Sequence, residues 1–225
     1  MLHGYRSESV TLPPEHSLLN TLDNVLESMF PERIETERLH LERISHDSVD
    51  VFDLHHLYSD GEGTEEMFEY WDSSPHETVK ETYDYVDEAE RLWDDLEGAK
   101  YVLRPKDGED GAGDIAGTTG LYPDWEKRSA SLGIILDNRF WGRGYAGERA
   151  DAILDVAFDR LNLELVVAGH VDGNEKSRRA ITKYVDRYGG TYEGHLRNWH
   201  RLPDTVGDVH RYTISREEYV EASRP

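Results

Sequence analysis

The chain has 225 residues, of which 47 are acidic and 25 basic, so its net charge is -22, and it has no cysteine. The length suits one α/β domain with a sizeable core plus an appendage, and the acidic charge without a basic face excludes direct binding of nucleic acid. The lack of cysteine excludes disulfides, a thiolate nucleophile and thiolate metal sites, and the lack of a spanning apolar segment or signal-like N-terminus predicts a cytoplasmic protein with no membrane partner.

Residues 1–31 predict an N-terminal helical extension. Pro13 and Pro14 open an amphipathic pattern that Pro31 ends, and one face of it carries Leu18, Leu19, Leu22, Val25, Leu26 and Met29. We expect this apolar stripe to pack on its own domain. A homodimer contact and a lid over a cleft are the alternatives.

The next segments predict helices followed by a hairpin. Between residues 45 and 93, aromatic and aliphatic side chains recur at helical spacing. Residues 106–113 are rich in glycine and acidic residues, which is typical of a solvated loop between two strands.

The most informative stretch joins a strand to a helix. Residues 131–136 predict the strand, and apolar residues at three- and four-residue steps from Ala146 to Leu161 predict a helix with one face against a sheet. Between them stands Trp141-Gly142-Arg143-Gly144-Tyr145-Ala146. Its glycines allow a tight turn, and the first turn of the helix presents unpaired N–H groups and a positive dipole end. The junction therefore predicts an anion site, and we expect a pyrophosphate there.

A second strand and helix follow. The β-branched run 165–171 predicts the strand, and Asp172-Gly173-Asn174 predicts a turn in which Asn174 caps the helix. The inner stripe of this helix is Ser177, Ile181, Tyr184, Val185 and Tyr188, before two glycines end it. A dinucleotide-binding unit begins in the same order, but here the third glycine and the acid that ends the second strand are missing.

Taken in order, these motifs resemble the GNAT superfamily of acyl-CoA-dependent N-acetyltransferases, and within it the RimJ/RimL type. The resemblance is carried by residues 36–42, 117–121, 141–146, 174–179 and 208–212. It implies the mixed α/β GNAT fold, with a central twisted mixed sheet of about seven strands flanked by helices. It also implies a GNAT domain over residues 32–217, a C-terminal tail over 218–225, acetyl-CoA as cosubstrate, and an amine substrate.

The resemblance further implies the cofactor-binding residues. The pantetheine would lie between the strands that end near Leu136 and His170, Asn174 would bond the pantetheine arm, and Ser177 would stand near the thioester sulfur and protonate the thiolate. The backbone amides that would hold the CoA pyrophosphate are those of Arg143, Gly144, Tyr145, Ala146 and Gly147.

Two residues depart from the superfamily pattern. Trp141 opens the loop in place of Gln or Arg, as is common in the RimJ/RimL branch. Ser131 stands where the superfamily usually has a glutamate that relays a proton from the amine. Another base, or water, must serve, and a noncatalytic acyl-CoA-binding or regulatory module remains the alternative function. An NAD-dependent oxidoreductase is a second alternative.

The resemblance implies that the segment 193–200 lines the acceptor cleft, and this segment supplies the candidate general base. We favour His200, because an imidazole ordinarily titrates near neutral pH and accepts a proton directly or through water. A surface-loop histidine is the plainer interpretation, and His170, Asp124 and Glu126 are weaker candidates. No histidines have convincing metal-ligand spacing, so we expect no metal.

The acidic residues are spread along the whole chain, which predicts a halophilic archaeal source. Self-repulsion of this size costs stability in dilute salt, but at molar salt the Debye length falls to about 3 Å. CoA must then be held by donors at contact range, among them Arg139, Arg143, Arg178 or Arg179. Pairing with the abundant carboxylates is the alternative role of each arginine.

Overall fold

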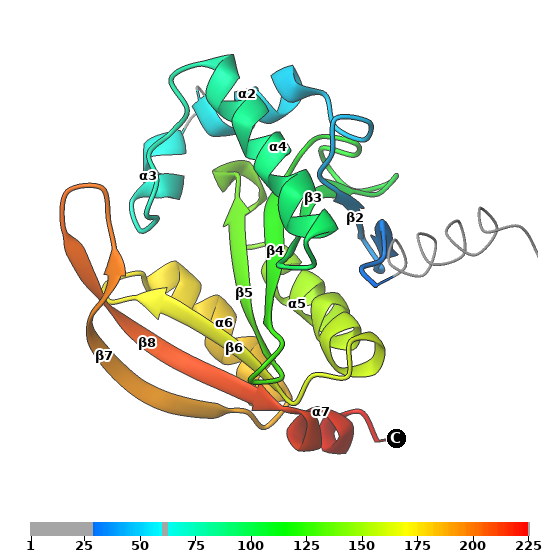
Figure 1. The fold of residues 1–225 in the computed structure, drawn as a ribbon, viewed down its shortest axis with the longest axis vertical. Helices are drawn as coiled ribbons and strands as arrows, with labels where there is room; N and C mark the ends of the chain where they lie inside the picture. Colours follow the sequence, from blue (N-terminus) through cyan, green and yellow to red (C-terminus); the bar gives the residue numbers. More distant parts are fainter. Residues whose placement is uncertain (1–28, 60–62, 225) are drawn as a thin grey trace, which may run out of the picture.

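A computed structural model describes residues 29–59 and 63–224, so the helix expected within residues 1–31 lies outside the described residues except at its end. The described chain builds an eight-stranded sheet in the order β1-β2-β3-β4-β5-β6-β8-β7 (Figure 1). Only β5 and β6 pair in parallel. The mixed α/β class is confirmed, with one strand more than the seven expected. A doubly wound dinucleotide-binding sheet is mostly parallel, so the topology speaks against the oxidoreductase.

Five antiparallel strands form the first half of the sheet. They are β1 (Arg33–Glu35), β2 (Leu39–Arg43), β3 (Ala99–Pro105), β4 (Gly117–Asp124) and β5 (Ser129–Leu136). Successive side chains of β3 alternate between the faces, since Tyr101 and Leu103 join one buried cluster and Val102 joins the other. Both faces of this half are therefore covered.

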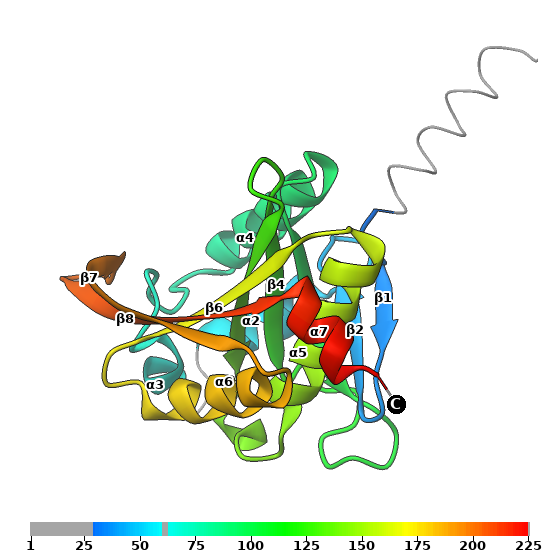
Figure 2. The ribbon, with the colours of Figure 1, turned by 90° about the horizontal axis from the view of Figure 1, so that it is seen from below.

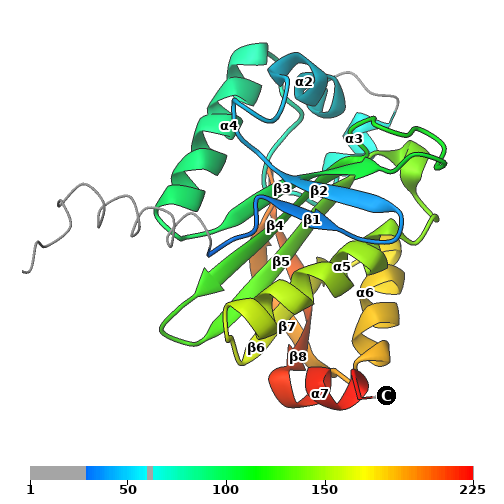
Figure 3. The ribbon, with the colours of Figure 1, turned by 90° about the vertical axis from the view of Figure 1, so that its right-hand side faces the viewer.

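Three helices cover one face, and they confirm the helices predicted between residues 45 and 93. They are α2 (Val51–Ser59), α3 (Thr64–Phe68) and α4 (Val79–Asp94). A capping box of Thr78 and Glu81 starts α4. Figure 3 shows this layer on one side of the sheet and α5 and α6 on the other.

On the opposite face, α5 (Tyr145–Asp155) continues into a π-helical turn, η2 (Val156–Arg160), and α6 (Glu175–Arg187) lies beside it. The predicted apolar stripe of α5 is buried, as Ile153, Leu154 and Phe158 show. Ile181, Tyr184 and Val185 of α6 are buried as predicted, whereas Ser177 and Tyr188 are partly exposed. A short 3₁₀ turn, η1 (Asn138–Phe140), precedes the glycine loop.

The second half of the sheet comprises β6 (Leu165–Val171), β8 (Val206–Ser215) and β7 (Thr191–Arg201). The β7–β8 hairpin curves away from the body of the molecule (Figures 1 and 2). After β8, α7 (Arg216–Ala222) includes much of the stretch expected as a tail. The buried Tyr219 attaches α7 to α5 and η2, because its hydroxyl donates to Asp155 at 2.7 Å and to Asp159 at 2.8 Å. None of the described helices combines the length and apolar character needed to span a bilayer.

Candidate functional site

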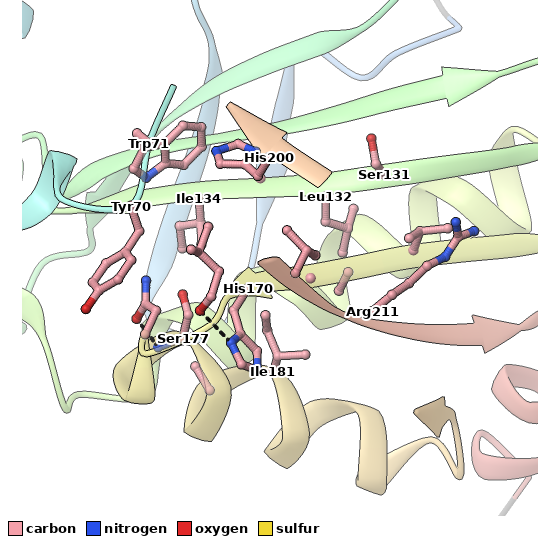
Figure 4. A pocket seen from close by; sticks show the side chains of 18 of the residues that line it. Tyr70, Trp71, Ser131, Leu132, Ile134, His170, Ser177, Ile181, His200 and Arg211 are labelled. Carbon is pink, nitrogen blue, oxygen red and sulfur yellow. Dashed lines mark hydrogen bonds between the residues drawn. The ribbon is translucent and has the colours of Figure 1, made fainter. Parts of the chain in front are cut away.

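A cavity lies where the two halves of the sheet meet. β5 and β6 pair only at Ser129↔Leu165, Ala130↔Val166 and Ser131↔Val167, and the strands then separate (Figure 1). A cavity of about 540 Å³ lies in the gap, and Figure 4 shows side chains that line it. The resemblance implies that the pantetheine would lie in this gap.

The cavity is bordered from both faces of the sheet. Ala146 of α5 and Ala180, Ile181 and Tyr184 of α6 line it from the face that carries these helices. Trp71 lines it from the stretch between α3 and α4, which lies on the other face. A ligand held against α5 and α6 can therefore meet a second ligand that arrives from the opposite face.

The glycine loop enters α5 through two left-handed glycines. Gly142 has φ 77° and Gly144, the N-cap of α5, has φ 84°. Such positive φ favours glycine, because a Cβ is strained there. Within the described chain, the amides from Arg143 to Ala146 have no hydrogen-bond partner, while the amide of Gly147 donates to the carbonyl of Gly144 at 3.1 Å. Four of the five predicted amides are therefore free to bind an anion.

A partly buried carboxylate fixes this loop to the first strands. Glu148 accepts hydrogen bonds from the Thr36 hydroxyl at 2.5 Å, the Arg38 amide at 2.6 Å and Arg38 Nε at 2.8 Å. Arg38 in turn donates to the carbonyl of Arg143 at 2.9 Å. Burial acts to raise the pKa of Glu148, but these hydrogen bonds outweigh burial and hold the pKa below its usual range. Residues 36–38, which directly precede β2, form this anchor.

Three of the four arginines proposed near CoA already pair with carboxylates. Arg139 binds Asp137 at 2.8 Å, and Arg143 binds Asp110 at 2.9 Å. Arg178 binds Glu175 at 2.6 Å. These three guanidinium groups thus take the alternative role, pairing with carboxylates, and the unpaired donors of the loop are its amides.

Asn174 and Ser177 are brought to the cavity together at the start of α6. The Asn174 side chain accepts from the Ser177 amide at 2.9 Å, which confirms the predicted cap. Both residues line the cavity, and the Ser177 hydroxyl makes no hydrogen bond with any described residue. Leu136, by contrast, is not among the lining residues, and its carbonyl accepts from the Trp141 indole at 2.8 Å. The cavity wall on β5 ends with Ile134.

A bulge in β7 turns His200 into the cavity. The β7–β8 register shifts between Leu196 and His200, where Asn198 has φ 53° and its amide donates to Asp208 at 2.8 Å. His200 Nε2 is buried and has no hydrogen-bond partner among the described residues. Figure 4 places its imidazole beside Trp71. The nitrogen therefore has no partner in the described chain and lies where a ligand in the cavity can reach it.

The weaker candidate bases are occupied or lie elsewhere. His170 lines the cavity, but its ring nitrogens contact the Val171 carbonyl at 3.0 Å and the Tyr212 hydroxyl at 3.3 Å. Burial lowers the pKa of His170, although the bond to the Val171 carbonyl favours the charged form. Asp124 pairs with Lys127, and neither Asp124 nor Glu126 lines the cavity.

The structure adds polar cavity residues that the sequence did not reveal, among them Asp72, Tyr122 and Arg149. Asp72 follows Trp71, and Tyr122 lies opposite Ser131 on β4. Tyr122 fits because nearby glycines leave room for its ring, since a Cβ at Gly120 would lie 2.5 Å from the Tyr122 hydroxyl oxygen. The third residue, Arg149, could have been noticed, because it lies one turn beyond Ala146 on the apolar stripe of the helix.

Strand register also gathers residues with metal-ligand chemistry. His195 faces His210 across β7 and β8, and ligand atoms of these two histidines and Asp172 lie within 4.8 Å of one another. His195 contacts Asp208 at 3.0 Å and His210 contacts Asp172 at 3.2 Å. Each of the two histidines thus also has a carboxylate neighbour.

Comparisons with known proteins agree with this geometry. Residues 38–184 match the family described as "Acetyltransferase (GNAT) domain". A Bacillus licheniformis protein named "Uncharacterized N-acetyltransferase p20" is 26% identical over 189 residues, which cover 84% of this chain and 98% of the relative.

Solved structures share the fold. An acetyltransferase of the GNAT family from Bacillus anthracis has a TM-score of 0.66 at 20% identity, covering 82% of this chain and 99% of that one. The Vibrio cholerae spermidine N-acetyltransferase, solved with CoA and spermine, has a TM-score of 0.64 at 22% identity, covering 81% of this chain and 98% of that one.

Proposed function

Because the chain belongs to the GNAT acetyltransferase family and is an N-acetyltransferase, we propose that it transfers acetyl from acetyl-CoA to a primary amine by direct attack. The preferred acceptor is the α-amine of a protein N-terminus, as in the RimJ/RimL type, and a small amine is the alternative. The observation that carries this proposal is the separation of β5 and β6 into a cavity reached from both faces of the sheet.

The donor side of the cavity holds CoA in this proposal. The free amides from Arg143 to Ala146 bind the pyrophosphate, with the dipole of α5 behind them. The pantetheine lies along β5 and β6 beyond the last paired residues and bonds to Asn174. Bound CoA supplies an activated thioester, and the rest of the chemistry belongs to the protein and the amine.

The acceptor side removes a proton. The amine must be neutral to attack, and His200 accepts its proton directly or through water. The bond between nitrogen and the acyl carbon forms, the bond between carbon and sulfur breaks, and Ser177 donates a proton to the thiolate. Strand amides that point into the gap beyond Ser131 serve as donors to the oxyanion.

The absence of a glutamate at Ser131 favours an acceptor that loses its proton easily. An amine with the pKa of lysine, about 10.4, costs roughly 4–5 kcal/mol to neutralise at pH 7, whereas an α-amine near 8 costs about 1.4 kcal/mol. A weak base such as an imidazole is therefore sufficient for a peptide N-terminus. The likeness to a polyamine enzyme is a reason to include spermidine among the acceptors tested.

We also propose that the protein works in the cytoplasm of a halophile, because its charge of -22 is tolerated best where salt screens it. Purified protein in molar salt should therefore release free thiol from acetyl-CoA when mixed peptides with free N-termini are added. Peptides with blocked N-termini are the matched control. Binding of acetyl-CoA without thiol release would favour a noncatalytic module, and no binding would refute the proposal.

A further inference from the structure

Arg149 is a buried cation without a partner. It lies on α5, its side chain is 2% exposed, and neither Nε nor Nη1 has a hydrogen-bond partner among the described residues. Its position follows from helix geometry, because residue 149 comes three after Ala146 and four before Ile153, both on the inner face. A guanidinium keeps its charge even when it is buried.

This lack of a partner is unusual in so acidic a chain. The protein has 47 acidic residues, and many of the described arginines pair with carboxylates, as Arg187 does with Asp151. No described carboxylate forms an ion pair with Arg149. A buried charge without a partner is costly, whereas a charge that meets an opposite charge from a ligand is compensated. Arg149 therefore has the character of a binding residue for an anion from outside the chain.

The anion must enter the cavity to reach Arg149. This residue and Tyr184 line the cavity on the face of α5 and α6, and both side chains are almost fully buried. The pyrophosphate donors are instead at the start of α5, at Arg143 to Ala146. Tyr184 lies seven residues beyond Ser177 on α6, which is about 10 Å along the helix axis. The anion site is therefore deeper along α6 than the serine proposed to stand near the sulfur.

We propose that Arg149 binds a carboxylate at the far end of the acyl group, so that the protein uses CoA monothioesters of dicarboxylic acids in addition to acetyl-CoA. A planar guanidinium binds a carboxylate through two parallel hydrogen bonds. In the transfer step, the amine nitrogen bonds to the thioester carbon, the carbon–sulfur bond breaks, and the amine proton goes by way of the base to solvent while the thiolate is protonated. The product is an amide that ends in a carboxylate.

The experiment measures binding rather than turnover, and the inference rests on the proposed CoA site. Calorimetry in molar salt compares CoA, acetyl-CoA and succinyl-CoA on the wild-type protein and on Arg149→Met, which keeps an unbranched apolar stem and removes the guanidinium. We expect the wild type to bind succinyl-CoA at least tenfold more tightly than acetyl-CoA. Arg149→Met should abolish this ratio and leave acetyl-CoA binding within about threefold, since one charge-assisted hydrogen bond accounts for about tenfold. Arg187→Met is the control and should keep the ratio.

Each contrary result has a separate meaning. No binding of any CoA compound refutes the proposed function together with this inference. Equal binding of acetyl-CoA and succinyl-CoA to the wild type refutes the inference alone, and this comparison needs no variant. If Arg149→Met weakens all three ligands equally, the guanidinium binds the phosphates. If it leaves the affinities of all three ligands unchanged, the guanidinium binds an anion other than the acyl group, such as one on the acceptor. Both of these results overturn the inference.

Discussion

The carboxylate of Glu148 offers a direct test of how the CoA loop is held. Glu148→Gln keeps the size of the side chain but replaces one acceptor oxygen with an NH₂ group. That group would face donors, because Arg38 contributes its amide, Nε and Nη2 to the Glu148 carboxylate, the last at 2.7 Å. The substitution therefore removes the ion pair with Arg38 and places the new NH₂ group against N–H groups of Arg38, which are also donors.

The loss of stability in Glu148→Gln can be estimated from how far the pair is buried. The side chain of Glu148 is 15% exposed and that of Arg38 33%, so solvent screens this pair only in part. Loss of hydrogen bonds to a charged group costs about 1.5–3 kcal/mol. For a chain of this size, each kcal/mol corresponds to about 2–4 °C of melting temperature, so we expect the melting temperature to fall by roughly 3–12 °C. Acetyl-CoA should also bind more weakly, because Arg38 holds the carbonyl of Arg143.

Thermal melts across pH and calorimetry with acetyl-CoA, both in molar salt, measure these effects. The pKa of Glu148 in the folded protein lies below its ordinary value of 4.5, so its stabilisation is complete above that value. The stabilisation is lost as the pH falls through the folded pKa. The difference in melting temperature between wild type and Glu148→Gln should therefore shrink below about pH 4.5.

Glu88→Gln is the matched control, because Glu88 binds Arg91 on the surface of α4, where both side chains are 48% exposed. Exposed pairs contribute about 0–1 kcal/mol, so its melting temperature should hardly change. Equal effects of the two substitutions, or an unchanged acetyl-CoA affinity in Glu148→Gln, would show that this carboxylate does not organise the loop.

Three further substitutions test the other parts of the site. His200→Ala should lower turnover by about 10²–10⁴-fold with little change in acetyl-CoA affinity, as expected for a general base, and unchanged kcat in steady-state assays would remove His200 from the mechanism. Asn174→Ala loses the cap on the Ser177 amide and should cost about 0.5–2 kcal/mol in denaturant unfolding, together with CoA affinity. Gly144→Ala puts a Cβ at φ 84°, at a cost of about 1–2 kcal/mol, and calorimetry should show weaker CoA binding; wild-type affinity would contradict the role given to the loop.

The elements around the donor side could be predicted from the sequence because their causes are local. Apolar spacing fixes the inner faces of α5 and α6, and the Asn174 cap and the loop glycines depend on residues a few positions apart. The cap hydrogen bond from the Ser177 amide forms as expected. These are the parts of a chain that short-range patterns describe best.

The acceptor side could not be predicted, because its causes lie in strand pairing. The bulge near Asn198 exists only through the partner strand, and nothing in residues 193–200 alone indicates that His200 turns inward. Tyr122 likewise depends on glycines of neighbouring strands, among them Gly133, which pairs with Gly120. Cross-strand register is not visible in the spacing of one segment.

The short parallel pairing of β5 and β6 affects how easily the sheet opens locally. In the described chain, only three residue pairs of β5 and β6 join the two halves of the sheet, and the two strands then separate. Amides of β6 next to this pairing should therefore exchange their hydrogens for deuterium sooner than those of β4, which is paired along its length with β5. A ligand that spans the gap contacts both halves of the sheet, so its binding should slow amide hydrogen exchange in both halves. The two halves should then open together as one cooperative unit.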